Sequence, residues 1–103
     1  MYMDLKQAQE RFPHVRFIAH PRNRHAMIYI AHDVQIGKNV AMSHEVSISD
    51  GAVIGDDCFL GHRCQIGKRA VIGNRCTLMA RTIVVADMTM PEGTTLRTKE
   101  LFH

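Results

Sequence analysis

Aliphatic residues recur at every sixth position over most of the chain. The series runs for nine repeats without a gap: Ile30, Ile36, Met42, Ile48, Ile54, Leu60, Ile66, Ile72 and Leu78. The residue after each of them is small in eight of the nine repeats, and five of the seven glycines lie at that position. An amphipathic helix spaces its apolar residues three and four apart, and a half-buried strand spaces them two apart. The six-residue period therefore excludes both.

A six-residue repeat predicts a solenoid of short strands. Each repeat forms one strand and one turn, and three repeats close one triangular coil. The aliphatic residue points into the prism, and a small or branched residue four positions later fills the remaining interior, as Val40, Ala52 and Cys64 do. We expect the glycine after the aliphatic residue to relieve a tight corner, because it has no Cβ. The fold class is therefore all-β, a parallel β-helix forming a triangular prism of about four to five coils.

The repeat weakens toward both ends of what we predict to be a single domain. Upstream, Arg24 falls where an aliphatic residue belongs, and downstream one extra residue is expected between Leu78 and Val85. The predicted parts of the domain 1–103 are an irregular first coil at 12–29, regular repeats at 30–83 and a degenerate last coil at 84–96.

A short helix is predicted before the first coil. The segment from Asp4 to Arg11 is rich in helix formers, and Pro13 follows it. Because solenoids must cover their terminal edges, we expect this helix to cap the open N-terminal end of the prism.

Composition narrows the function classes. The net charge is only +3 and six residues are aromatic, so nucleic acid is not an expected partner. No apolar run is long enough to span a membrane, and residues 1–11 lack the apolar core of a signal peptide, so we expect a cytoplasmic protein.

Cys58, Cys64 and Cys76 all occupy the small interior position and form no CxxC pair, which predicts buried, unreactive thiols.

Five of the seven histidines share one phase, two residues after the aliphatic position: His14, His20, His32, His44 and His62. His44 and His62 are eighteen residues apart and are expected in one column, with His14 and His32 in a second. Such outward positions tolerate histidine as an ordinary polar residue. An imidazole there can also serve as a general base, and three imidazoles can hold zinc across an interface between chains.

The repeat array resembles the left-handed β-helix of the hexapeptide-repeat acyltransferases, over about two thirds of the chain. Within it, Ile30-Ala31-His32-Asp33-Val34-Gln35-Ile36-Gly37 resembles a segment of the UDP-3-O-acylglucosamine N-acyltransferases. The resemblance implies that His32 is the base that deprotonates an amine or hydroxyl acceptor, which attacks a thioester on coenzyme A or acyl carrier protein. It also implies a homotrimer with sites in the clefts between chains. Ala26 stands where that family has an acidic partner for the histidine.

A second resemblance keeps a metal site open. The segment Leu60-Gly61-His62-Arg63-Cys64 is similar to part of the γ-class carbonic anhydrases, although Gly67 stands where their second histidine lies. His44 and His62 are the alternative bases and the candidate metal ligands. Lys68, Arg69 and Arg75 are weaker candidates for binding the phosphates of coenzyme A. Three hypotheses therefore remain: an acyltransferase, a non-catalytic trimeric scaffold, and a metal site.

Overall fold

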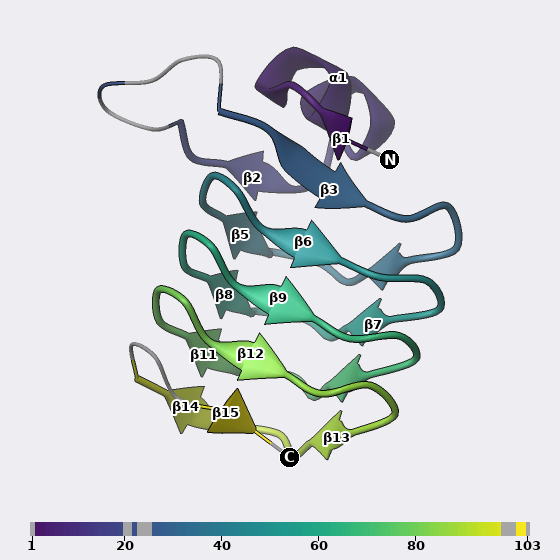
Figure 1. Ribbon diagram of the computed structural model, residues 1–103, viewed down its shortest axis with the longest axis vertical. Coiled ribbons are helices and arrows are strands. Elements are labelled where there is room, and N and C mark those ends of the chain that lie inside the picture. Colours follow the sequence, from purple (N-terminus) through teal and green to yellow (C-terminus); the bar gives the residue numbers. More distant parts are fainter. Residues whose placement is uncertain (1, 20–21, 23–25, 98–100, 103) are drawn as a thin grey trace.

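The computed structural model describes residues 2–19, 22, 26–97 and 101–102, with side chains for all of these except the last two. This part of the chain is a β-helix with one short helix at its N-terminal end, α1 (Leu5–Arg11) (Figure 1). The strands are β1 (Tyr2–Met3), β2 (Arg16–Phe17), β3 (Ile28–Ile30), β4 (Gln35–Ile36), β5 (Ala41–Met42), β6 (Ser47–Ile48), β7 (Val53–Ile54), β8 (Phe59–Leu60), β9 (Gln65–Ile66), β10 (Val71–Ile72), β11 (Thr77–Leu78), β12 (Ile83–Val84), β13 (Thr89–Met90), β14 (Thr95–Leu96) and β15 (Leu101–Phe102).

Each coil places one strand on each face of a triangular prism. The three sheets have the orders β1-β3-β6-β9-β12-β15, β4-β7-β10-β13 and β2-β5-β8-β11-β14. Coils from β3 onward pair residues eighteen apart, as Ser47 pairs with Gln65, and among the described strands β1 alone runs antiparallel to its neighbour. In Figure 1 the chain crosses the front face from left to right and returns behind it while descending. The winding is therefore left-handed, as the resemblance implied.

The aliphatic positions form the core. Ile30, Ile48 and Leu60 are fully buried, and the series continues in register through Val84, Met90 and Leu96. Val84 pairs with Ile66, eighteen residues earlier, so the extra residue expected near the C-terminal end is not present. Three consecutive apolar residues, Ile83 to Val85, made that phase ambiguous in the sequence.

The first coil departs from the repeat by an insertion. Phe17 in β2 pairs with Met42, twenty-five residues later, so seven additional residues separate β2 from the regular array. Extended upstream from Ile30, the six-residue period reaches Ile18, but Phe17 is the residue aligned with Met42 of the core column. Arg24, on which the expected break rested, lies outside the described residues.

The turns carry a left-handed residue at every sixth position, mostly a polar one. Their φ angles lie between 56° and 76° at Asn39, Glu45, Gly51, Asp57, Arg63, Arg69, Arg75, Arg81, Asp87 and Gly93. The glycines after the aliphatic residues lie two positions earlier and have a different role. A Cβ on Gly67 would stand 2.4 Å from the backbone nitrogen of Ala86, and one on Gly55 would stand 2.9 Å from that of Asn74. Glycine is therefore needed there for close stacking of coils, and the expected corner role is wrong.

Helix α1 covers the N-terminal end of the prism, as predicted. Asp4 caps it: its carboxylate accepts from the N–H of Gln7 at 2.8 Å, and the Gln7 side chain accepts from the N–H of Asp4 at 3.0 Å. Ala8 is fully buried against the first coil. No helix among the described residues has the length and apolarity needed to cross a bilayer.

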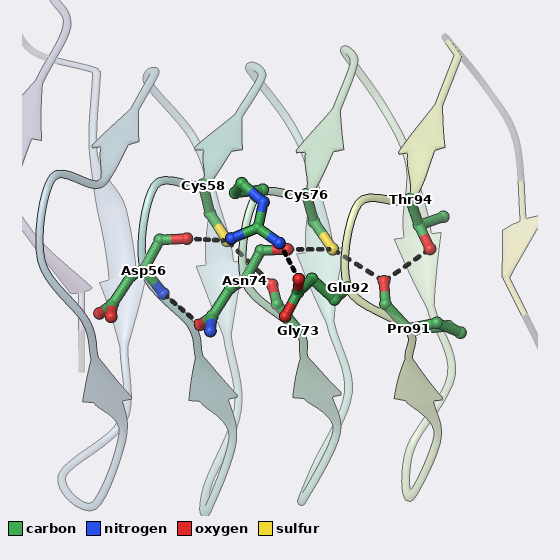
Figure 2. Close-up of polar contacts among 9 residues, drawn as sticks. Asp56, Cys58, Gly73, Asn74, Cys76, Pro91, Glu92 and Thr94 are labelled. Atoms are coloured by element: carbon green, nitrogen blue, oxygen red, sulfur yellow. Dashed lines mark hydrogen bonds and ion pairs between the residues drawn. The ribbon is translucent and has the colours of Figure 1, made fainter.

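The small interior positions carry hydrogen-bond donors that join successive coils. The thiols of Cys58, Cys64 and Cys76 donate to carbonyls fifteen residues later, on Gly73, Met79 and Pro91, with sulfur–oxygen distances of 3.2, 3.1 and 3.1 Å. Figure 2 shows Cys58 and Cys76 stacked in one corner and directed at the following coil. Burial raises the pKa of the Cys58 and Cys64 thiols, because the thiolate would lose its solvation. The three cysteines are buried and free, as predicted.

Candidate active site

The first candidate base lies on a turn at the N-terminal end of the array. His32 is exposed in the turn between β3 and β4, in the coil directly beneath α1. Ala31 before it is buried, so the turn is anchored to the core on one side and presents the imidazole to solvent on the other. An exposed imidazole is accessible to an incoming acceptor, which a base in proton transfer requires.

This turn lacks a hydrogen bond that the turns from residue 57 onward share. In those turns, the N–H of the left-handed residue donates to the carbonyl nineteen residues earlier: Asp57 to Lys38, Arg63 to His44, Arg69 to Asp50, Arg75 to Asp56, Arg81 to His62, Asp87 to Lys68 and Gly93 to Asn74. By this rule Gly51 would donate to the carbonyl of His32. Its N–H donates instead to the Asp33 carboxylate at 2.7 Å. Asp33 itself has a negative φ, although residues at its phase in the next three coils are left-handed.

The His32 carbonyl accepts a hydrogen bond from a side chain of α1 instead. The Arg11 guanidinium, at the end of α1, donates to three consecutive carbonyls: Ile30 at 3.4 Å, Ala31 at 3.2 Å and His32 at 3.1 Å. The same guanidinium lies 5.1 Å from the centre of the Phe12 ring. Arg11 therefore supplies the His32 carbonyl with the donor that the N–H of Gly51 does not provide, and it holds the backbone of the turn that carries His32.

His44 and His62 form a second cluster, one corner away. Both follow strands of the β5-β8 sheet, and their rings stack with centroids 5.1 Å apart and planes inclined by 5°. This confirms that they share a column. His44 is 8% exposed, and its Nδ1 lies 3.1 Å from the Ser43 hydroxyl. The arrangement is that of a packed polar cluster with one partly exposed ring, His62.

The second expected column is not formed. Because of the insertion after β2, His14 lies beside the corner after β4, where its Nε2 is 3.0 Å from the Ile36 carbonyl oxygen. His32 lies at the corner before β4. The two residues therefore occupy different corners, and His20 lies outside the described residues.

The geometry of the stacked histidines does not favour a shared metal. Imidazole lone pairs lie in the ring planes, so two parallel rings 5.1 Å apart direct them side by side instead of toward one ion. Among the residues that the structure describes, no group of three or more His, Cys, Asp or Glu side chains is placed to hold a metal.

The basic candidates are divided between two corners. Lys68 and Arg69 follow β9, whereas Arg75 follows β10. The Arg69 guanidinium pairs with Asp87 at 2.6 Å, and that contact lowers the pKa of the Asp87 carboxyl. Arg75 pairs with Glu92. The three residues thus form no single cluster on one chain.

A depression of about 790 Å³ lies on the β3-β6-β9 face, beside the His44–His62 corner. Tyr2 and Met27 are among its apolar lining residues. Glu45 and Arg63 also line it and form an ion pair, with 3.3 Å between the carboxylate oxygen and the guanidinium nitrogen. Tyr2 contacts Tyr29 edge-on, with ring centroids 5.0 Å apart.

The sequence alone did not identify three of these residues. Asp33 and Ser43 are neighbours of histidines that were singled out, so proximity was the only indication available. Nothing in the sequence indicated Arg11, because its contacts are with residues nineteen to twenty-one positions away and depend on how the helix docks.

Comparison with known proteins finds a family match within part of the repeat array. Residues 51–86 match the family model described as bacterial transferase hexapeptide, six repeats. The matched segment covers about a third of the sequence, and its strands β7 and β8 pair with β4 and β5 of the coil that carries His32. No curated protein matched the sequence.

Several solved structures also matched, with low identity and low TM-scores. One is PerB from Caulobacter crescentus in complex with CoA and GDP-perosamine, with 18% identity, a TM-score of 0.37, and coverage of 95% of this chain and 56% of that one. A mutant of GDP-perosamine N-acetyltransferase from the same organism has 19% identity, a TM-score of 0.30 and coverage of 93% and 57%. A hexapeptide transferase family protein from Anaplasma phagocytophilum has 15% identity, a TM-score of 0.27 and coverage of 84% and 76%. The chain thus spans a little over half the length of the first two.

Proposed function

We propose that this chain transfers an acyl group from a thioester donor to an amine or hydroxyl acceptor, with His32 as the general base. The observation that carries the proposal is the match of residues 51–86 to bacterial transferase hexapeptide repeats. The coil that carries His32 pairs with these repeats through β4 and β5, and the His32 side chain is exposed. The local resemblance of residues 30–37 to an N-acyltransferase segment supports the choice of this histidine over His44, which is packed within its corner.

The reaction needs one proton acceptor and no redox partner. The neutral imidazole of His32 takes a proton from the acceptor as its nitrogen or oxygen attacks the thioester carbonyl. A tetrahedral intermediate forms, the carbon–sulfur bond then breaks, and the imidazolium returns the proton to the departing thiolate. The products are the acylated acceptor and a free thiol. Either an acyl-coenzyme A or an acyl carrier protein supplies the same thioester.

A homotrimer is part of this proposal. On one chain the His32 side chain is exposed on a turn. A second copy packed alongside supplies a wall that orients an acceptor and a donor, and the gain from holding two reactants in place is large. Light scattering should give about three times the 11.7 kDa of one chain. A monomer at micromolar concentration would contradict the interchain site.

The activity is tested by the release of free thiol from acetyl-coenzyme A and, separately, from an acyl carrier protein. Each donor is offered with a panel of amine and hydroxyl acceptors. Replacing His32 by Ala should lower the rate by roughly a hundredfold or more while donor binding, measured by thermal shift, is retained. His14→Ala, which removes a histidine from another corner, is the matched control. A wild-type chain that releases no thiol from either donor is a non-catalytic scaffold, and the proposal is then wrong.

A further inference from the structure

The turn that carries His32 differs from the later turns in backbone and in hydrogen bonding. Ten turn residues of the array adopt the left-handed conformation, whereas Asp33, at the same phase in the first regular coil, does not. Aspartate tolerates the left-handed conformation better than most residues, and Asp57 and Asp87 adopt it in this array. The residue type at position 33 is therefore not the reason for the difference.

Two contacts replace the ordinary one. The Asp33 carboxylate accepts the N–H of Gly51 at 2.7 Å, which frees the His32 carbonyl from the contact between coils. The Arg11 guanidinium then donates to that carbonyl at 3.1 Å and to the Ala31 carbonyl at 3.2 Å. A forked guanidinium holds more than one acceptor in a fixed geometry, which an ammonium does less well. The backbone on both sides of the His32 Cα is thereby tied to the capping helix.

From these contacts we infer that Arg11 and Asp33 are positioning residues, which fix the turn so that the His32 imidazole points from the surface in one direction. The inference rests on the proposed function, in which His32 is the base. Neither side chain touches the reacting atoms. Arg11 acts through the carbonyls of the turn, and Asp33 acts by diverting the N–H of Gly51. The capping helix thus has a second role besides covering the end of the prism.

The kinetic test compares Arg11→Gln with Arg16→Gln, which removes an exposed arginine from the outer side of β2. A base displaced by about 1 Å loses roughly ten- to a hundredfold in rate, so kcat of Arg11→Gln should fall by that factor while KM changes less than about twofold. Arg16→Gln should keep the wild-type values. Asp33→Ala should lower kcat in the same way, and Asp33→Asn should restore it, because its amide oxygen still accepts the N–H of Gly51. Wild-type kcat in Arg11→Gln, or equal losses in both arginine variants, would overturn the inference.

A second readout does not depend on turnover. Amide exchange by NMR should show faster exchange at Gly51 in Asp33→Ala than in Asp33→Asn, and increased mobility of residues 31–34 in Arg11→Gln but not in Arg16→Gln. If the wild-type chain proves inactive, the proposed function fails and the positioning of His32 is judged on this readout alone. Unchanged exchange and mobility in all variants would then overturn the positioning role as well.

Discussion

The imidazole rings of His44 and His62 lie parallel, 5.1 Å apart, in adjacent coils at one corner of the prism. The Ser43 hydroxyl lies 3.1 Å from Nδ1 of His44, and the residues Ser43 and His44 are each 8% exposed. The column therefore joins two coils through stacked rings, in addition to the backbone hydrogen bond from Arg63 to the His44 carbonyl at 3.1 Å.

Removing the His44 ring should destabilise the fold. His44→Ala removes a buried ring, its stacking contact with the His62 ring and the hydrogen bond with Ser43. We therefore expect a loss of about 1–3 kcal/mol in the free energy of unfolding. Urea denaturation at neutral pH measures it. His32→Ala serves as the control and should change stability by less than about 0.5 kcal/mol, because its side chain is exposed. Equal losses in the two variants would contradict a structural role for the stack.

Two glycines of the array should respond differently to alanine. A Cβ on Gly67 meets the backbone nitrogen of Ala86 at 2.4 Å, so neighbouring coils must separate, and we expect a loss of about 3 kcal/mol. Gly93 has φ of +76° and open space around its Cβ position, so Gly93→Ala should cost about 1 kcal/mol of conformational strain. Thermal unfolding of the two variants measures the difference. A larger effect at Gly93 would show that turn conformation, not coil spacing, limits the stacking.

The core and the coil register were accessible from the sequence because a closed prism places the same demand on every sixth residue. That demand predicted the stacking of His44 on His62, since residues eighteen apart must share a column. The six-residue period does not give the correct register at β2, where a seven-residue insertion leaves Phe17, and not Ile18, aligned with Met42. Insertions shift the register without changing the composition of the segment.

The contacts around His32 were not accessible in this way. The hydrogen bonds from Arg11 depend on the docking of a helix that lies outside the repeat. The left-handed turns were also missed, because arginine occupies four of the ten positions and has no special preference for that conformation. At these four arginines the backbone N–H donates to a carbonyl of the preceding coil, and that hydrogen bond overrides the local preference of the residue.

Side chains on one edge of the prism also cap the backbone of the coil before them. The Asp56 carboxylate accepts the N–H of Lys38 at 2.8 Å, and the Asn74 side-chain oxygen accepts the N–H of Asp56 at 2.8 Å, as Figure 2 shows for the latter. Asp56→Ala removes an acceptor from this ladder and should cost about 1 kcal/mol, measured by urea denaturation. Asp56→Asn retains an oxygen at the same place and should recover most of that loss. If both variants lose the same stability, the carboxylate charge is responsible and the ladder is not.

The buried thiols should make stability fall at alkaline pH. Burial raises the pKa of Cys58 and Cys64 above the ordinary value of 9.0, so the folded chain keeps each proton to a higher pH than the unfolded chain does. The unfolded state then binds fewer protons than the folded state, and the free energy of unfolding decreases as pH rises past 9.0 toward the folded-state pKa values. The contribution is fully present below 9.0.

The matched control is the double variant Cys58→Ser, Cys64→Ser. A serine hydroxyl does not titrate in this range, and the buried Thr82 hydroxyl already donates in the same way, to the Arg97 carbonyl at 3.3 Å. Urea denaturation between pH 8 and pH 10 should therefore show a steeper decline for the wild-type chain than for the double variant, with other titrating groups common to both. Parallel declines would mean that the thiols ionise equally readily in the folded and unfolded chains, which their burial opposes.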